Sequence, residues 1–478
     1  MARYVRPEPG VSPYDLVIIG GGSAGLTAAS FAVQTGARVL LLEADRLGGD
    51  CTWTGCVPSK ALIHAARLAQ GTRKASWIEA GKPDFARAMR EVRAAVDRVY
   101  SFETPERLRA TGVDVVMEAA RFLDPRTVQA GSSRFQGDRF VICTGAAAET
   151  PPIPGLRETP HLTHETVFDL DRLPDRLLVL GGGATGSELA QAFARLGSQV
   201  TIFDLAGRLL PAADPEASRV IEDRFRSEGI RLCLNSAVEA VQSDEDRVVV
   251  AAGGESFEGD ELLVALGRRP RVEGLNLAEA GVVADVGGIR VDSHLRTSQP
   301  GLYAAGDVTG GPQFTHQAAW QGFTAARNAL LPGRASGRKQ PVPWAVFTDP
   351  EVAQVGLDET QARERVGGRV TVLRWPIERI DRAQADGESA GFIKVLAQTN
   401  GRLLGATIVS PAAGELANEL TLALEARLTL GDLAEAMHVY PTYGIALQQL
   451  ASAQRIRSVT SGWRGRLLRG LRRIRRQQ

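Results

Sequence analysis

The segment "YDLVIIGGGSAGLTAASFAVQTGARVLLLEAD" (residues 14–45) decides how the N-terminal part of the chain folds. Its apolar run Leu16–Ile19 predicts a buried parallel strand, because such strands are covered on both faces. Three glycines then follow with the spacing G-x-G-x-x-G, before a helical stretch, a second apolar strand and an acidic residue. The first glycine permits a tight turn, the second lets a pyrophosphate approach the backbone, and the third lets the helix pack on the strand. The segment therefore predicts a dinucleotide site formed by Gly20, Gly22, Gly25 and Glu43.

The same unit recurs in "DRLLVLGGGATGSELAQAFARLGSQVTIFD" (residues 175–204), at a constant offset of 161 residues. Two such sites in one chain predict two dinucleotides, and a flavin with a nicotinamide is the economical pair. Asp204, at the place of Glu43, favours an unphosphorylated ribose and hence NADH. Arg208 lies nearby in the sequence and leaves NADPH open. The glycines of the second turn are Gly181, Gly183 and Gly186.

The bulk composition restricts the class of protein. A chain of 478 residues is expected to form roughly three domains. Apolar runs stay short of the ~18 residues of a membrane span, and the first residues lack the apolar core of a signal peptide. We therefore expect an intracellular, cytoplasmic protein, in which four cysteines do not indicate a disulfide scaffold.

The net charge of +1 conceals a basic C-terminus. Nine arginines and no acidic residue follow from residue 455 onward, so the rest of the chain has 47 basic and 55 acidic residues and a charge of −8. In "SGWRGRLLRGLRRIRRQQ" (residues 461–478) the apolar residues would share one side of a helix, opposite most arginines. This pattern predicts an amphipathic helix that lies peripherally on the anionic inner face of a membrane. A solvated tail is the alternative, and no specific nucleic-acid contact is expected.

The segment "GGDCTWTGCVPSKAL" (residues 48–62) places two of the four cysteines five residues apart. Cys51 and Cys56 do not form a CxxC motif, so neither a zinc knuckle nor a thioredoxin-type pair fits. Two cysteines so close together in an intracellular protein indicate redox work. The other two, Cys143 and Cys233, lie in strand-like stretches and are predicted to be small buried hydrophobic residues.

Further motifs follow in a fixed order along residues 13–455. They are "GGDCTWTGCVPSK", "VICTG", "ALGRRP", "LYAAGDVTG", "FTDPEVAQVG" and "HVYPTY", together with the two glycine turns. In this order they resemble the flavoprotein disulfide reductases, the family of dihydrolipoyl dehydrogenases, glutathione reductases and mercuric reductases. The resemblance implies an α/β chain with two Rossmann-type dinucleotide-binding domains and a C-terminal mixed α/β dimerisation domain. It also implies FAD and NAD(P)H as cofactors and a homodimer as the working form.

The resemblance and the proline-rich connectors together predict the domain boundaries. Proline density in "TGAAAETPPIPG" and in "LPGRASGRKQPVPW" marks two of the crossings. We expect a first FAD-binding part at 1–150, an NAD(P)H-binding domain at 151–268, a second FAD-binding part at 269–340, an interface domain at 341–455 and the basic tail at 456–478.

The resemblance also implies roles for individual residues. Cys51 and Cys56 would form the redox disulfide, with Cys56 against the flavin and Cys51 facing the substrate. Lys60 would lie near flavin N5 and pair with Glu188, so that neither charge is buried alone. A helix N-terminus and Lys60 would lower the pKa of the Cys56 thiol. Further cofactor contacts are implied at Glu43, Gly145, Asp307 and His316 for FAD and at Gly267 for the nicotinamide nucleotide.

A disulfide between these two cysteines constrains the backbone between them. On a regular helix, positions five apart point about 140° away from each other. A disulfide needs Cα atoms within about 7 Å. We therefore expect residues 52–55 to leave the regular helix, with Gly55 giving the backbone that freedom. Pro58 suits the first turn of the helix that follows.

The C-terminal motif departs from the family pattern. Disulfide-reducing members carry a histidine base and a glutamate that orients it, whereas this chain has Tyr440 and Ile445 at those places. Tyrosine, with a pKa near 10, is a poor base at neutral pH, so exchange with a disulfide substrate is predicted to be slow. Mercuric reductases share the tyrosine, although this chain lacks their terminal cysteine pair. His438 is a candidate substitute base.

We therefore predict an FAD-dependent oxidoreductase that passes electrons from NAD(P)H through Cys51 and Cys56 to an acceptor. The acceptor is a soft metal ion, held transiently by both sulfurs, or a small electrophile. No structural metal site is expected. One alternative is a dihydrolipoyl dehydrogenase or other disulfide reductase that uses His438 as its base. Another is a membrane-associated flavoprotein that senses redox state without turnover.

Overall fold

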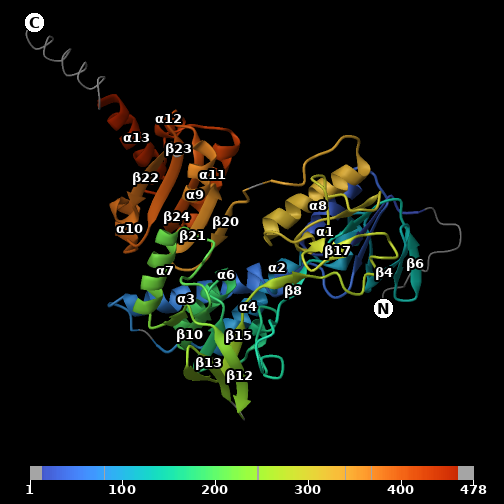
Figure 1. Ribbon diagram of the computed structural model, residues 1–478, viewed down its shortest axis with the longest axis horizontal. Helices are drawn as coiled ribbons and strands as arrows, with labels where there is room; N and C mark the ends of the chain where they lie inside the picture. The colour runs from blue at the N-terminus through green and yellow to red at the C-terminus, as the bar shows by residue number, and fades with distance from the viewer. Residues whose placement is uncertain (1–12, 80, 245–246, 340, 368, 461–478) are drawn as a thin grey trace, which may run out of the picture. The chain divides into compact units, whose positions relative to one another are not determined.

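The computed structural model describes residues 13–79, 81–244, 247–339, 341–367 and 369–460 (Figure 1). The chain divides into two compact units. The first unit comprises the residues up to 181 with 192–203 and 236–339, and the second comprises 182–191, 204–235 and the residues from 340 onward.

The first unit contains most of the strands. Its elements are β1 (Leu16–Ile19), α1 (Ser23–Gln34), β2 (Val39–Glu43), α2 (Gly49–Trp53), α3 (Cys56–Lys74), α4 (Phe85–Tyr100), α5 (Pro105–Ala110), β3 (Asp114–Met117), β4 (Ala120–Asp124), β5 (Thr127–Ala130), β6 (Ser133–Gln136), β7 (Phe140–Ile142), β8 (Ala146–Ala148), η1 (Val167–Asp169), β9 (Arg176–Leu180), β12 (Val238–Asp244), β13 (Arg247–Ala252), β14 (Glu255–Gly259), β15 (Glu261–Val264), β16 (Arg268–Pro270), β17 (Ala284–Asp285), β18 (Gly288–Ile289), β19 (Leu302–Ala304), η2 (Asp307–Thr309) and α8 (Thr315–Leu330). Helix α6 (Ala184–Leu196) and strand β10 (Gln199–Asp204) contribute residues to both units.

The second unit contains α7 (Pro215–Ser227), β11 (Arg231–Leu234), β20 (Trp344–Val346), β21 (Glu351–Gly356), α9 (Glu359–Val366), β22 (Val370–Pro376), η3 (Ile377–Arg379), α10 (Asp381–Asp386), β23 (Phe392–Gln398), β24 (Leu403–Ser410), α11 (Ala413–Glu425), α12 (Leu430–Glu435) and α13 (Ile445–Thr460). The predicted tail, residues 461–478, lies outside the described residues.

The first unit is built on a parallel five-stranded sheet in the order β19-β7-β1-β2-β3. Every residue of β1 is buried, as its apolar run predicts. Because successive strand residues face opposite sides, Leu16 and Ile18 pack with α1 and α8, whereas Val17 packs toward the β4-β5-β6 sheet. Helices α1 and α8 lie side by side (Figure 1). Both faces of the sheet are therefore covered.

The second glycine turn follows a similar parallel arrangement. Strand β9 pairs in parallel with β10 and β15, and its last four residues, "LLVL", are buried. The antiparallel β12-β13-β14 sheet lies between these strands in the sequence. The predicted α/β class with two repeats of one nucleotide-binding unit is confirmed.

An antiparallel sheet in the order β20-β21-β24-β23-β22 forms the core of the second unit. One face packs against α11, α12 and α13. On β23, Ile393 and Val395 join this core, while Lys394 between them faces the other side and is buried. The Lys394 ammonium lies 2.9 Å from the Asp214 carboxylate and also contacts Glu216, so this buried ion cluster attaches the start of α7 to the sheet.

No helix in the part of the chain that is drawn as a ribbon in Figure 1 is long and apolar enough to cross a membrane.

Candidate active site

The first glycine turn has the close contacts that its sequence predicts. Gly20 adopts a φ of +103°, and a Cβ there would lie 2.4 Å from the Cys143 carbonyl oxygen. A Cβ on Gly25 would lie 1.8 Å from the Gly20 carbonyl oxygen. Both positions therefore need glycine for the turn and for the packing of α1 on β1.

Gly22 is different, because the protein itself does not require a glycine there. Its φ is −80°, and a Cβ would meet its nearest described atom at 3.7 Å, an ordinary contact. Gly22 is the N-cap of α1, and no described side chain accepts a hydrogen bond from the first turn of that helix. The space and the unmet N–H groups fit a pyrophosphate at a helix N-terminus.

Glu43 is held beside this turn by two backbone amides. One carboxylate oxygen accepts a hydrogen bond from Gly21 N–H at 2.6 Å, and the other accepts one from Asp45 N–H at 2.8 Å. Carboxylate oxygens have about four acceptor sites in total, so capacity remains for ribose hydroxyls.

The second glycine turn has the same hydrogen bonds as the first. Gly181 has a φ of +107°, and no described atom comes within 4 Å of a Cβ built on Gly183. The Asp204 carboxylate accepts hydrogen bonds from Gly182 N–H at 2.6 Å and from Ala206 N–H at 2.7 Å. The two copies therefore agree in their hydrogen bonds as well as in their spacing.

The backbone breaks between the two cysteines, as their spacing predicts. Helix α2 ends at Trp53, and α3 begins at Cys56. Gly55 has φ −122° and ψ −109°, and a Cβ there would lie 2.7 Å from the Asp50 carbonyl oxygen. Position 55 therefore needs glycine for two reasons: the freedom of its backbone and the close approach of the Asp50 carbonyl oxygen. Pro58 lies in the first turn of α3, as predicted.

Contacts of Trp53 and of its neighbour Thr52 hold the interrupted segment in place. Its indole N–H donates to the Leu47 carbonyl at 2.8 Å, and its ring packs on Tyr100 of α4 with ring centroids 4.7 Å apart. The hydroxyl of Thr52 donates to the Glu103 carboxylate at 2.8 Å. The redox segment is thus tied to the end of α4.

The two cysteines meet at the start of α3. A hydrogen bond to Cys56, together with burial, raises the pKa of the Cys51 thiol far above its ordinary value. Cys51 therefore keeps its proton and directs it toward Cys56. Of the other two cysteines, Cys143 is buried as predicted, whereas Cys233 is only half-buried.

The Cys56 sulfur also contacts the side chain of the first residue of helix α8, which the sequence did not reveal. Its Sγ lies 3.2 Å from the hydroxyl oxygen of Thr315, the first residue of α8, while Cys56 itself begins α3. Helix N-termini stabilise negative charge. Thr315 directly precedes His316, whose ring stacks on Phe314 at a centroid distance of 5.4 Å. The contact of His316 with FAD stays a prediction, and the contact of its neighbour Thr315 with Cys56 was not predicted from the sequence.

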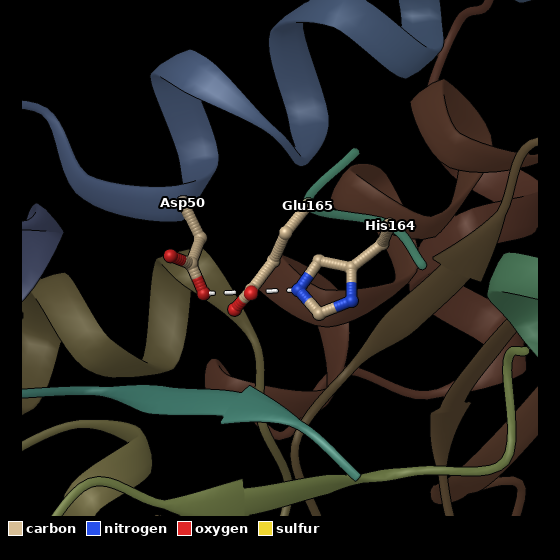
Figure 2. Close-up of side chains that lie close together, drawn as sticks. All are labelled: Asp50, His164 and Glu165. Atoms are coloured by element: carbon tan, nitrogen blue, oxygen red, sulfur yellow. Dashed lines mark ion pairs between the residues drawn. The ribbon is translucent and has the colours of Figure 1, made fainter. Parts of the chain in front are cut away.

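Asp50, just before Cys51, is the centre of an ionic cluster. Figure 2 shows its carboxylate pointing toward His164 and Glu165, and the three ligand atoms lie within 4.8 Å of one another. His164 Nε2 is 3.9 Å from Asp50, too long for a hydrogen bond. Arg271 lies 2.7 Å from Glu165 and 3.6 Å from Asp50, so both carboxylates are already neutralised. The cluster therefore fits a cation poorly.

Arg268 connects this cluster to η2. It pairs with Asp50 and, at 3.0 Å, with Asp307. Burial favours the neutral form of Asp50, but His164 and the arginines outweigh it and hold the Asp50 pKa below its usual range. At Asp307 burial outweighs Arg268, and the pKa is raised. Sequence reasoning assigned Asp307 to the flavin but missed Asp50 and Arg268.

The glycines of "VICTG" and "ALGRRP" lie beside a short antiparallel ribbon of β8 and β16. Arg271 N–H donates to the Gly145 carbonyl at 2.9 Å, and Glu149 N–H donates to the Gly267 carbonyl at 3.1 Å. Both glycines have positive φ angles, +72° and +134°. Their cofactor contacts stay predictions.

Lys60 and Glu188 lie in different units, so their ion pair also stays a prediction. Lys60 is one turn after Cys56 in α3, and its ammonium donates to the Ser59 hydroxyl at 3.3 Å. Glu188 is buried in α6 and accepts a hydrogen bond from Phe347 N–H at 2.8 Å.

The C-terminal motif belongs to the second unit. The Tyr440 hydroxyl donates to the Asp381 carboxylate at 2.8 Å. His438 is held by the Ala436 carbonyl at 3.0 Å and by the Glu419 carboxylate at 2.8 Å, one partner for each ring nitrogen.

Comparison with protein families agrees with this geometry. Residues 14–322 match the model described as pyridine nucleotide-disulphide oxidoreductase, and residues 342–451 match the dimerisation domain of the same family. The chain belongs to the pyridine nucleotide-disulphide oxidoreductases. It is therefore a flavin-dependent NAD(P)H oxidoreductase.

Relatives in this oxidoreductase family have different substrates. A mercuric reductase of Bacillus cereus is 36% identical over 451 residues, which cover 92% of this chain and 71% of the relative. A dihydrolipoyl dehydrogenase of Thermus scotoductus is 37% identical over 458 residues, covering 92% and 97%. The Cu(II) complex of the HOCl-induced flavoprotein disulfide reductase RclA from Escherichia coli has a TM-score of 0.83, with 31% identity and coverage of 91% and 99%.

Gly22 and Gly183, where the protein has space for a Cβ, allow the two cofactor sites of this oxidoreductase to be tested separately. Alanine fits the protein at Gly22 and at Gly183, so each substitution should leave the fold intact and block only the ligand. We expect Gly22→Ala to purify without flavin absorbance. Gly183→Ala should retain FAD but require at least about tenfold more NADH for flavin reduction.

The control is Gly71→Ala, in α3, where no described atom comes within 4 Å of an added Cβ. It should keep both cofactors and gain up to about 1 kcal/mol of stability, because alanine favours a helix. If Gly22→Ala bound FAD as tightly as Gly71→Ala, the assignment of the first turn to FAD would be wrong.

Proposed function

We propose that this oxidoreductase passes electrons from NADH through FAD and the Cys51–Cys56 pair to a soft metal ion. A small electrophilic acceptor such as a quinone is the alternative substrate class. The observation that carries the proposal is the contact between the two cysteines at the start of α3.

FAD, when bound, supplies a carrier that accepts a hydride from the nicotinamide and passes an electron pair to a disulfide. The chain's own residues control the sulfur that receives it. Two helix N-termini at Cys56 favour its negative charge, and the Cys51 thiol directs a proton toward it. We propose that Lys60, one turn further along α3, adds a positive charge beside the flavin and is neutralised by Glu188.

The reduced pair has two electrons to give to an acceptor. Its sulfurs are soft ligands that select soft metal ions. A mercuric ion held between them would take both electrons as the S–S bond forms, and two cupric ions would take one each. In both cases one proton, that of the Cys51 thiol, leaves to solvent, because the Cys56 sulfur is already a thiolate. The mercuric reductases and the Cu(II)-binding RclA among the relatives support this class of acceptor.

The C-terminal motif disfavours a disulfide substrate. The hydrogen bond to Asp381 raises the pKa of Tyr440, so this hydroxyl is a poor base near neutral pH. Both nitrogens of His438 already have partners within its own unit, which favours a structural role. Thiolate-bound metal reduction does not need such a base.

Two observations support NADH over NADPH. The Asp204 carboxylate is fixed by two amides at the end of β10, where it would repel a 2′-phosphate. Arg208, the residue that leaves NADPH open, donates to the Pro211 carbonyl at 2.8 Å.

The dimerisation domain supports a homodimer. Large apolar side chains are exposed on the second unit, where a dimer interface would cover them. They are Leu422, Met437, Val439, Tyr440 and Ile456. By resemblance to the family, Tyr440 would reach the flavin site of the partner subunit, next to which the cysteine pair is proposed to lie.

The tail leads to a separate proposal, made from its sequence. Residues 461–478 hold seven arginines and a set of apolar residues suited to one helical face, so we infer contact with anionic lipid at the cytoplasmic surface. Anionic vesicles should sediment the full chain at low salt but not a chain that ends at residue 460. Equal sedimentation of both chains would contradict the inference.

The acceptor can be identified with a panel of mercuric, cupric, lipoamide, glutathione disulfide and quinone substrates. We expect NADH-driven reduction of a soft metal ion. Its rate should be at least about 100-fold lower in Cys56→Ala, because that variant cannot pass electrons through the cysteine pair. Turnover with NADPH should be slower than with NADH.

Cys233→Ala is the matched control. Cys233 lies on β11 and is not part of the proposed redox pair, so the substitution should leave all rates unchanged. Rapid lipoamide turnover would contradict the proposal and favour a dihydrolipoyl dehydrogenase. Quinone reduction that survives Cys56→Ala would instead show that the flavin serves that acceptor directly.

A further inference from the structure

Helix α10 holds both tyrosines of the "YPTY" motif. Tyr440 donates to Asp381, the first residue of α10, at 2.8 Å, and Tyr443 donates to Asp386, its last residue, at 3.1 Å. The guanidinium of Arg382 in turn holds Asp386, at 2.9 and 2.8 Å from its two oxygens. The motif is therefore attached to one short helix at two points.

These contacts matter most for Tyr440, which is 63% exposed. An exposed phenol without such a bond would sample several rotamers. The bond to Asp381 fixes the direction of its oxygen. Asp381 lies 59 residues earlier in the chain, so α10 acts as a separate support for the motif.

The direction of this bond also decides what Tyr440 can do. A phenol has a single proton, and Tyr440 gives it to Asp381, so its remaining lone pairs can only accept or coordinate. The same bond raises the pKa of Tyr440 and keeps the phenol neutral. A neutral oxygen whose lone pairs remain available can coordinate a cationic acceptor, but it has no proton left to donate to a thiolate.

We propose that Asp381 is a positioning residue, which holds the Tyr440 hydroxyl so that its oxygen presents lone pairs to a metal ion at the partner subunit's cysteine pair. This inference rests on the proposed function, because Tyr440 acts only if a cationic acceptor arrives. No bond is broken in this step, and the proton stays between Tyr440 and Asp381. Tyr443 and Asp386 hold the far end of the motif.

The test compares four FAD-loaded variants: Asp381→Ala, Asp381→Asn, Tyr440→Phe and the double variant Asp381→Ala/Tyr440→Phe. We expect Asp381→Ala and Tyr440→Phe to lower kcat/KM for the metal ion by the same factor, about 10-fold to 100-fold. The double variant should show no further loss, because both changes remove one interaction. Asp381→Asn keeps an acceptor oxygen and should stay within about threefold of the parent protein.

Two readouts separate positioning from a general structural effect. The rate of flavin reduction by NADH should be unchanged in all four variants, since Tyr440 does not take part in it. Titration of tyrosinate absorbance should show one tyrosine whose pKa falls toward about 10 in Asp381→Ala, and this change should vanish in the Tyr440→Phe background.

A parent protein without metal-ion turnover would overturn the proposed function, while the tyrosinate titration would still report the contact. Unchanged titration in Asp381→Ala, or full metal-ion activity in that variant beside an impaired Tyr440→Phe, would overturn the role of Asp381 alone.

Discussion

The proposed electron path depends on the contact between the Cys51 and Cys56 side chains. This contact exists only because α2 stops at Trp53 and α3 starts at Cys56, since an uninterrupted helix would point the two side chains apart. Gly55 permits the break, where its backbone passes close to the Asp50 carbonyl. Trp53 then fixes the break by packing on Tyr100. A local backbone interruption thus creates the redox pair.

The first unit also places charged side chains next to that pair. Each of the two glycine turns has one glycine, Gly22 or Gly183, at which the protein has room for a side chain. That room fits a nucleotide at each turn. Helix α8 packs on α1, and its first residue, Thr315, contacts the Cys56 sulfur. Arg268 connects Asp50, beside the cysteines, to Asp307 in η2.

Local patterns could be predicted from the sequence, and long-range contacts could not. The glycine spacing, the apolar strands and the break at Gly55 each depend on a few neighbouring residues, and the structure agrees with them. Thr315 meets Cys56 across 259 residues, Arg268 meets Asp50 across 218, and Asp381 meets Tyr440 across 59. Such pairs are fixed by packing rather than by periodicity, and no motif at either end identifies its partner. The half-buried state of Cys233 was mispredicted for the same reason, because an apolar strand does not reveal what covers it.

Anaerobic titration with NADH counts the electrons that the protein accepts and therefore shows whether the cysteine pair exchanges electrons with the flavin. If the cysteine pair exchanges electrons with the flavin, the parent protein should consume about two equivalents of NADH per FAD, and Cys56→Ala about one. A single equivalent in both proteins would contradict the account, since it would mean that the sulfurs touch each other without taking part in electron transfer.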